Sequence, residues 1–223
     1  VLAVLLFKTN LFRSDEGISR WRDPVWLAWV LPPLLMLHEF EEYSCHVVDG
    51  QFYMVTKMAG VIPNIFPGFT VPDAAFPLMN MTFAWVALPI AAMVARKNPV
   101  VGLSGYGFIL ANSLTHIGGS FVLGLGVLDN PGFFTGVFLS LGLNVWVGYV
   151  CITGSFMSRG GYAIMMVGGV LGHATLFATY AAGYLFGPAA MLVGCVVTSF
   201  APMLWAWLGS KIFQRRKPEA IQG

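Results

Sequence analysis

Long apolar stretches separated by short polar breaks dominate the chain. Six of them have the roughly 20 predominantly apolar residues that a helix needs to cross a bilayer. They cover residues 25–46, 76–95, 100–128, 132–157, 161–186 and 188–212. The breaks carry turn-forming residues, as in ARKNP at 95–99, LDNPG at 128–132, SRGG at 158–161 and FGP at 186–188. The pattern predicts an all-α fold, a polytopic transmembrane helix bundle of about six spans.

The remaining segments set the domain organisation. We expect a cytoplasmic or interfacial lead-in over residues 1–24, one transmembrane helical domain over 25–212 and a tail over 213–223. Within that domain, residues 47–75 are too polar and too rich in proline and glycine to span, and loops longer than about 12–15 residues are often functional. We therefore predict an outer loop there. The chain opens on Val1 and not on methionine, so we expect residues before it.

Composition supports a membrane location. Hydrophobic residues make up 57% of the 223 positions and charged residues 10%, whereas a soluble domain carries about 25% charged residues. The net charge of +2 is too small to indicate a nucleic-acid partner. Cys45, Cys151 and Cys195 all lie in apolar stretches without paired spacing, which indicates neither a disulfide framework nor a thiolate metal site.

The basic residues predict the orientation. With the N-terminus inside, eleven of the twelve lysines and arginines fall on the inner side, and Lys57 alone falls outside. Cytoplasmic segments carry the excess of basic residues in membrane proteins. We expect both termini in the cytoplasm and an integral protein of the cell (inner) membrane.

One predicted span contains unusual chemistry. PPLLMLHEFEEYSCHVV, residues 32–48, holds three carboxylates and two histidines. Glu41 and Glu42 follow His38 at i+3 and i+4, so both lie beside its imidazole on a helix. Each charge near the middle of a span costs about 2.5–3.5 kcal/mol even on the lenient insertion scale. These carboxylates therefore need a cation, protons or water.

Two other spans supply one histidine each, His116 and His173. Counted from the inner ends of their helices, at ~1.5 Å per residue, His38, His116 and His173 lie at depths of roughly 20, 24 and 18 Å. Three histidines on three helices thus reach nearly one level, close to Glu41 and Glu42. We predict a metal site formed by His38, Glu41, Glu42, His116 and His173.

Further residues are candidates for supporting roles. His46 and Asn112 are possible additional ligands, although His46 lies near the outer end of its span and Asn112 can equally bond a backbone group. Glu39 is a candidate general base, or a carboxylate that orients a histidine. Tyr180 and Tyr184 share the His173 face and are candidates to contact substrate, or are interfacial aromatics.

Ligand chemistry limits the metal. Carboxylate and imidazole ligands suit iron, manganese or zinc, and five ligands can hold one ion or two. The chief rival interpretation is a proton- or cation-conducting cavity, which uses the same residue types. A third possibility is a structural subunit whose polar cluster only joins helices.

The motif HEFEE at 38–42 resembles the signature of the HXXEE family of membrane proteins, with His38, Glu41 and Glu42 at its fixed positions. The family's later pattern is also present, as Asn112 with His116 and then Pro131, Gly132 and Thr135 in DNPGFFTG. The similarity covers roughly residues 25–145. Asn130 stands where the family commonly has an aromatic residue, and His173 lies outside the similar region. The family is defined by its motif more than by an activity, so the resemblance supports the site and not a reaction.

The function expected from these patterns is an integral-membrane metalloenzyme acting on a hydrophobic or amphipathic substrate in the lipid. Di-iron-type oxidative chemistry is slightly preferred over metal-dependent hydrolysis, because a carboxylate-rich site without thiolates suits iron. The alternative from another class is a small transporter or ion-coupled carrier, disfavoured by the lack of an inverted repeat.

Overall fold

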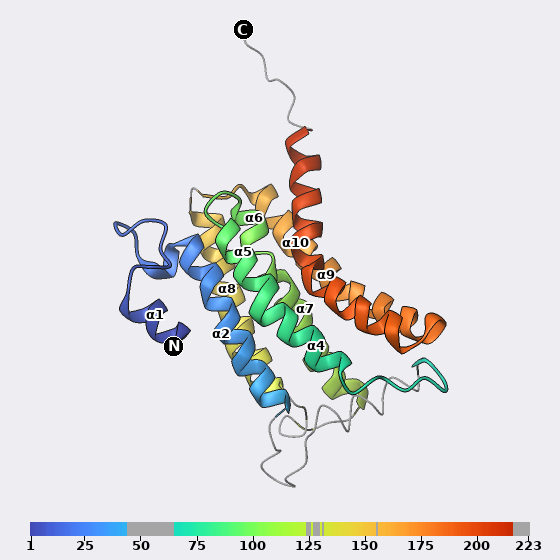
Figure 1. Ribbon diagram of the computed structural model, residues 1–223. Helices are drawn as coiled ribbons and strands as arrows, with labels where there is room; N and C mark the ends of the chain where they lie inside the picture. Colours follow the sequence, from blue (N-terminus) through green and yellow to red (C-terminus); the bar gives the residue numbers. More distant parts are fainter. Residues whose placement is uncertain (44–64, 124–125, 127–129, 131, 155, 216–223) are drawn as a thin grey trace.

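The computed structural model describes residues 1–43, 65–123, 126, 130, 132–154 and 156–215. Helices and turns account for these residues, with no strand among them. The bounds of the longer helices are α2 Pro24–Tyr43, α4 Ala75–Thr82, α5 Leu88–Val94, α7 Gly105–Leu123, α8 Leu141–Thr153, α9 Arg159–Phe186 and α10 Pro188–Arg215. Figure 1 shows them side by side in a bundle, which confirms the predicted all-α fold.

Two π-helical turns join shorter helices into longer ones. The turn η2 (Phe83–Ala87) makes α4 and α5 continuous, and η4 (Phe134–Ser140) runs directly into α8. Pro89 explains the first, because proline has no N–H to bond the carbonyl four residues back. A single widened turn of this kind is frequent at functional sites. The second turn contains Thr135 and Gly136, which lie at the site described below.

Five helices are long and apolar enough to cross a membrane. They are Ala75–Val94, Pro99–Phe121, Phe134–Thr153, Arg159–Phe186 and Pro188–Phe213. The second includes the short helix α6 (Pro99–Gly102). Many large apolar side chains on them are exposed, such as Trp85 (57%) and Val145 (68%), as expected of a surface that faces lipid. These helices indicate an integral membrane protein.

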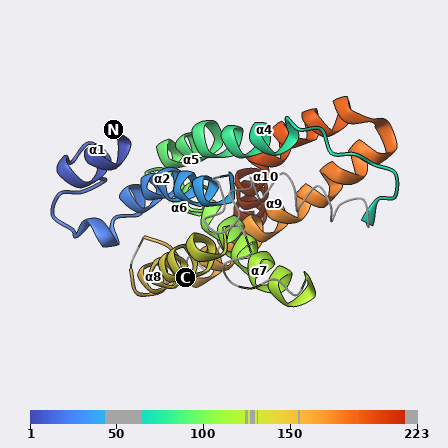
Figure 2. The same ribbon diagram turned by 90° about the horizontal axis from the view of Figure 1, so that it is seen from below.

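The remaining predicted span, 25–46, corresponds to α2. With 20 residues it has the length of a span, but it is not among the five, because His38 and three glutamates in its last two turns reduce its hydropathy. Figure 2 shows α2 between the α4–α5 helix and η4–α8. That a sixth helix crosses the membrane stays a prediction, and so does the cytoplasmic location of the termini.

The lead-in packs against the start of α2. Helix α1 (Leu2–Lys8) buries Leu6, whose carbonyl oxygen accepts a hydrogen bond from Trp26 Nε1 at 3.0 Å. Asp23 caps α2, since its Oδ1 accepts from the backbone N–H groups of Val25 and Trp26 at 2.9 and 3.3 Å. The same carboxylate also accepts from the Ser14 backbone at 2.7 Å. A buried Asp therefore fixes both the beginning of α2 and the loop before it.

Two apolar clusters hold the bundle together. The larger lies among α2, α5, α7 and α8 and includes Trp26, Leu31, Leu88 and Tyr106. The smaller joins residues 66–79 to α9 and α10, with Met79, Tyr180 and Met191 in it. Of the predicted loop 47–75, residues 47–64 lie outside the described residues.

Glycines set the crossing of α7 and α9. A Cβ on Gly169 would lie 2.4 Å from both the Phe108 nitrogen and the Ser104 oxygen, and one on Gly107 would lie 2.4 Å from the Met166 oxygen. These neighbours are backbone atoms, so only glycine permits this approach. The crossing fixes where α7, which carries a site histidine, lies relative to α9.

Candidate metal centre

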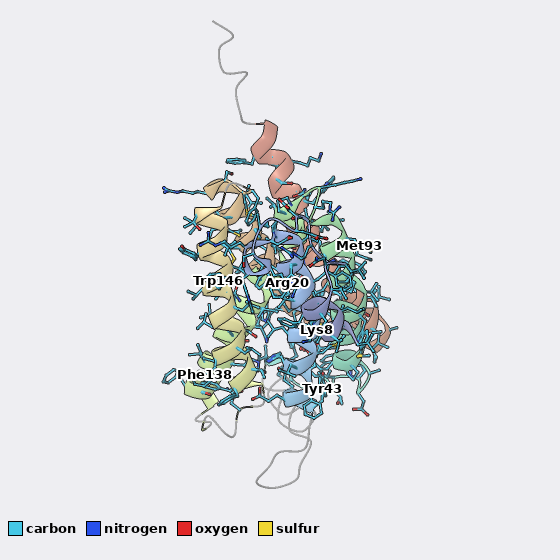
Figure 3. All side chains as sticks on the ribbon, turned by 90° about the vertical axis from the view of Figure 1, so that its left-hand side faces the viewer. Lys8, Arg20, Tyr43, Met93, Phe138 and Trp146 are labelled. Atoms are coloured by element: carbon cyan, nitrogen blue, oxygen red, sulfur yellow. The ribbon has the colours of Figure 1, made fainter. Side chains whose placement is uncertain are left out.

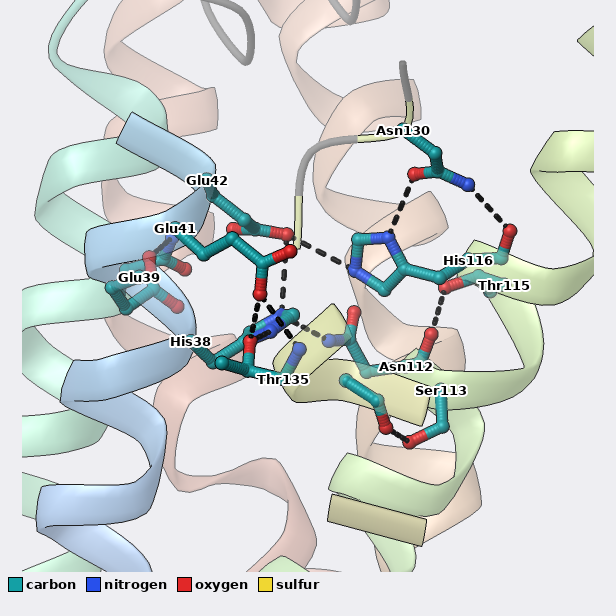
Figure 4. Close-up of polar contacts among 12 residues, drawn as sticks. His38, Glu39, Glu41, Glu42, Asn112, Ser113, Thr115, His116, Asn130 and Thr135 are labelled. Atoms are coloured by element: carbon teal, nitrogen blue, oxygen red, sulfur yellow. Dashed lines mark hydrogen bonds and ion pairs between the residues drawn. The ribbon is translucent and has the colours of Figure 1, made fainter. Parts of the chain in front are cut away.

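The site lies where α2, α7 and the beginning of η4 meet. Figure 4 shows His38 and Glu42 of α2 facing His116 of α7, with Thr135 of η4 below them. The i,i+4 spacing on α2 places His38 and Glu42 on one face of that helix. His38 and Glu42 are 3% and 4% exposed, and the His116 side chain is 10% exposed. Three ionisable groups from two helices are thus brought together away from water.

One carboxylate oxygen is shared by two imidazoles. Glu42 Oε1 lies 3.2 Å from His38 Nε2 and 3.1 Å from His116 Nε2. One ligand atom from each of the three residues lies within 4.8 Å of the other two, so this group could hold a metal ion. A search of the described residues for three or more His, Cys, Asp or Glu side chains with this geometry finds this group.

Thr135 fixes the proton of His38. The Thr135 hydroxyl donates to Glu41 Oε2 at 2.5 Å and so uses its single hydrogen there. Its oxygen lies 3.0 Å from His38 Nδ1 and must therefore accept the N–H from that nitrogen. A neutral His38 accordingly carries its proton on Nδ1, which leaves a lone pair on Nε2.

Asn130 does the same for His116. The Asn130 amide nitrogen donates to the His116 carbonyl at 2.7 Å and to Ser120 Oγ at 2.8 Å, which uses both of its hydrogens. Its Oδ1 lies 3.1 Å from His116 Nδ1 and accepts from it. The neutral imidazole of His116 therefore also presents an unprotonated Nε2 to Glu42.

Two imidazole lone pairs and one carboxylate oxygen thus point at a common position. Such groups repel one another unless a cation or a proton lies between them. Metal-binding histidines usually donate their other N–H to a carbonyl, carboxylate or similar acceptor, which fixes the tautomer and the ring orientation. Thr135 and Asn130 provide this support here, so the donor set fits a metal ion.

Glu41 has a different environment from Glu42. Its two oxygens accept from the backbone N–H groups of Phe134 at 2.9 Å and Thr135 at 2.7 Å, in addition to the Thr135 hydroxyl. The first N–H groups of a helix have no partner within the helix, and a carboxylate is favoured at that end. Glu41 therefore joins α2 to the beginning of η4.

A glycine turn closes the site on one side. Gly132 has φ of +77°, and a Cβ there would lie 2.6 Å from His38 Cε1, 2.7 Å from Glu42 Cγ and 2.9 Å from His116 Cε1. Both the backbone conformation and the lack of space thus require glycine. The backbone of this turn contacts all three members of the group.

The other predicted residues lie elsewhere or play other parts. Asn112 Nδ2 lies 2.7 Å from His38 Nε2. Glu39 accepts a hydrogen bond from Asn80 of α4, whose amide also donates to Tyr43 Oη at 3.1 Å. His46 falls outside the described residues.

The three remaining candidates lie on α9. His173 is 8% exposed and packs against the Phe108 ring, with centroids 5.0 Å apart. Tyr180 belongs to the smaller apolar cluster, whereas Tyr184 is 47% exposed. Among the described residues, the group that could hold a metal ion includes none of them.

Sequence reasoning did not assign roles to Asn130 and Gly132. The only signal was their position in the Pro-Gly motif, and their roles become visible once the fold places Asn130 and Gly132 beside the histidines.

The fold and the site together define a helical membrane-protein bundle with a buried histidine–glutamate centre. The chain belongs to the HXXEE family, because the family model described as a protein of unknown function with HXXEE motif matches residues 29–147. This range includes every residue of the centre, and the match confirms the resemblance seen in the sequence. Neither the curated proteins nor the solved structures contain a significant match.

Proposed function

We propose that the protein is an integral-membrane metalloenzyme that binds one metal ion through His38 Nε2, His116 Nε2 and Glu42. The observation that supports this most directly is the single Glu42 oxygen within 3.2 Å of both imidazole nitrogens. Hydrogen bonds from both Nδ1 atoms keep the ring protons there, so that both Nε2 atoms are unprotonated in the neutral rings. The substrate is a hydrophobic or amphipathic molecule from the lipid.

One ion fits better than two. A second ion would need further ligands, and of the predicted ones Glu41 is bonded to the start of η4 while His173 packs on Phe108. Three protein ligands leave open positions for water, oxygen or substrate. We therefore propose a centre with one metal ion in place of the di-iron arrangement that the carboxylate-rich sequence slightly favours.

The donor set suits two chemistries. Two histidines and one carboxylate bind iron(II) in oxygenases and also bind zinc in hydrolases. Oxidative chemistry is still slightly preferred, because carboxylate and imidazole ligands without a thiolate suit iron. A bound ion would supply Lewis acidity, or a site for oxygen or water activation.

The protein's own groups prepare the site. Thr135 and Asn130 hold the ring protons on Nδ1 of His38 and His116, so neither Nε2 is protonated in the neutral rings. Burial excludes water, which strengthens electrostatic interactions within the site. Exposed apolar residues beside it, Leu37 (53%), Phe40 (73%) and Phe134 (63%), supply a surface for a lipophilic substrate.

Element-resolved metal analysis of the purified protein tests the proposal. We expect about one transition-metal ion per chain in the wild type, and its loss in His116→Ala and Glu42→Gln. His173→Ala is the matched control, since this histidine is also buried in a membrane helix, and it should retain the metal. Stoichiometric zinc without iron would remove the oxidative preference.

The opposite result is equally defined. If the folded wild type holds no metal after supplementation with iron, manganese or zinc, the enzyme proposal is wrong. The same polar cluster would then favour the proton- or cation-coupled carrier.

A further inference from the structure

Asn112 lies directly at the proposed metal position. It precedes His116 by one helical turn on α7, so both side chains project from the same face. Its amide nitrogen lies 2.7 Å from His38 Nε2, the atom that also lies 3.2 Å from Glu42 Oε1. Asn112 therefore touches one of the three ligand atoms.

The present hydrogen bond uses a ligand lone pair. Because His38 carries its proton on Nδ1, its Nε2 can only accept, and the Asn112 N–H donates to it. A metal ion bound at Nε2 needs that same lone pair. Metal binding and this hydrogen bond are therefore mutually exclusive.

The Asn112 side chain can also present an oxygen atom at the same position. Rotation about its terminal torsion exchanges the nitrogen for Oδ1, a carbonyl oxygen with two lone pairs. Such a rotation has a broad, roughly two-fold profile and needs no change in the backbone. In addition, the Thr115 hydroxyl donates to the main-chain carbonyl oxygen of Asn112 at 2.7 Å, so the backbone at this turn of α7 is held in place.

We propose that Asn112 is a fourth protein ligand: its amide donates to His38 Nε2 when the site holds no cation, and presents Oδ1 to the metal when it does. This inference rests on the proposed metal centre. Carbonyl oxygen ligands suit manganese and related hard ions, whereas zinc is typically held by histidine, cysteine and carboxylate. Asn112 would therefore favour manganese(II) or iron(II) over zinc.

Two substitutions at this position separate a ligand from a positioning residue. Asn112→Asp keeps an oxygen but cannot donate a hydrogen bond, and Asn112→Ala removes both functions. Asn144, a buried asparagine of α8, provides matched controls in Asn144→Asp and Asn144→Ala. All proteins are stripped of metal and titrated with Mn²⁺ and Zn²⁺ in competition with a fluorescent chelator.

We expect Asn112→Ala to weaken Mn²⁺ binding about 10–100-fold, the usual effect of losing a group that supports a metal site, and to weaken Zn²⁺ binding less. Asn112→Asp should bind Mn²⁺ at least as tightly as the wild type. The Asn144 variants should bind both metals like the wild type, and thermal unfolding checks that every variant is folded.

Two results would overturn the inference. If Asn112→Asp loses affinity as far as Asn112→Ala, an oxygen at this position does not bind the metal. If both variants bind like the wild type, it has no part in the site. A wild type that binds neither metal would instead reject the metal centre itself, so the two failures are distinguishable.

Discussion

Glu41 and Glu42 are adjacent in the sequence and have separate tasks in the structure. Glu42 points at two imidazole nitrogens, whereas Glu41 accepts hydrogen bonds from the first residues of η4. One carboxylate thus supplies charge to the centre and the other holds the neighbouring helix. The two glutamates of the motif should therefore respond differently to the same substitution.

Glu42→Gln should abolish metal binding and leave the stability of the metal-free protein unchanged or higher, because a carboxylate facing two lone pairs is removed. Glu41→Gln should lower the free energy of unfolding by about 1.5–3 kcal/mol, the value of hydrogen bonds to a charged group. Thermal unfolding with and without added metal measures both effects. Equal behaviour of the two variants would contradict this division.

Gly132→Ala should also disable the centre. The new methyl group would lie within 2.9 Å of atoms of His38, Glu42 and His116, and φ of +77° is strained for alanine. We expect metal affinity and thermal stability to fall together, in a titration and a melting curve.

Gly142→Ala is the control for this substitution, because nothing lies within 4 Å of a Cβ there. It should leave metal binding intact and stabilise α8 by up to about 1 kcal/mol, the difference in helix propensity. Normal metal affinity in Gly132→Ala would show that the turn does not close on the ligands.

For single residues, the sequence predicts those neighbours that are set by the spacing along one helix. The i,i+4 relation was sufficient to place Glu42 beside His38, and depth counting brought His116 to the same level. The tasks of Glu41, Asn130 and Thr135 depend on where the start of η4 lies, which no local pattern determines. Depth counting placed His173 level with the others, but the α7–α9 crossing determines its lateral position.

At the scale of elements, close backbone contact between α7 and α9 positions one wall of the site. Gly107 and Gly169 lie at this contact, and a Cβ on either would meet backbone atoms of the other helix. Backbone atoms cannot yield without moving a whole helix. The position of His116 therefore depends on two residues that do not touch the centre.

Gly169→Ala should lower stability by about 1–3 kcal/mol, the usual cost of overpacking. Gly118→Ala is the matched control on α7, since nothing lies within 4 Å of a Cβ at that position. Thermal unfolding in detergent measures the difference. Two variants of equal stability would show that the helices do not cross as closely as described.

The helix boundaries were predictable because membrane helices are marked by length and by turn residues. The predicted span 76–95 corresponds to Ala75–Val94, and 161–186 to Arg159–Phe186. The π-helical turns were not predicted. Pro89 gives a local reason for the first, whereas Gly136 in the second has its carbonyl bonded to Ser113 of another helix at 2.6 Å.

On the scale of the whole molecule, the centre lies near one end of the bundle. His38 lies five residues before the end of α2, and His116 five residues before the end of its candidate span at Phe121. At ~1.5 Å per residue, both lie about 7–8 Å from that end. Tyr43 and Phe138 mark this end in Figure 3, opposite the C-terminal end of α10.

Basic residues gather at the other end, where α2 and α9 begin and α5 and α10 end (Figure 1). They include Arg22, Arg96, Lys97, Arg159 and Lys211. From the positive-inside rule we predict that the C-terminus lies in the cytoplasm and the centre towards the outer surface. The predicted orientation thus determines the side from which polar reactants reach the site.

Side-specific labelling tests this orientation. A cysteine at Lys57 should react with a membrane-impermeant reagent in intact cells, whereas a cysteine near residue 220 should react only after permeabilisation. The endogenous cysteines are replaced first, so each signal has one source. Labelling of both positions from the same side would contradict the five spans predicted between them.

The unequal lengths of the helices have a consequence for the surrounding lipid. Helices α9 and α10 have 28 residues each, which corresponds to ~42 Å, and α2 has 20 residues, which corresponds to ~30 Å. A typical hydrocarbon core is about 30 Å thick. A helix that exceeds this thickness tilts, and Figure 1 shows this hairpin inclined away from α2. Thicker or thinner bilayers should therefore change the slant of the hairpin, while α2, which matches the core and carries two of the three ligands, keeps its angle.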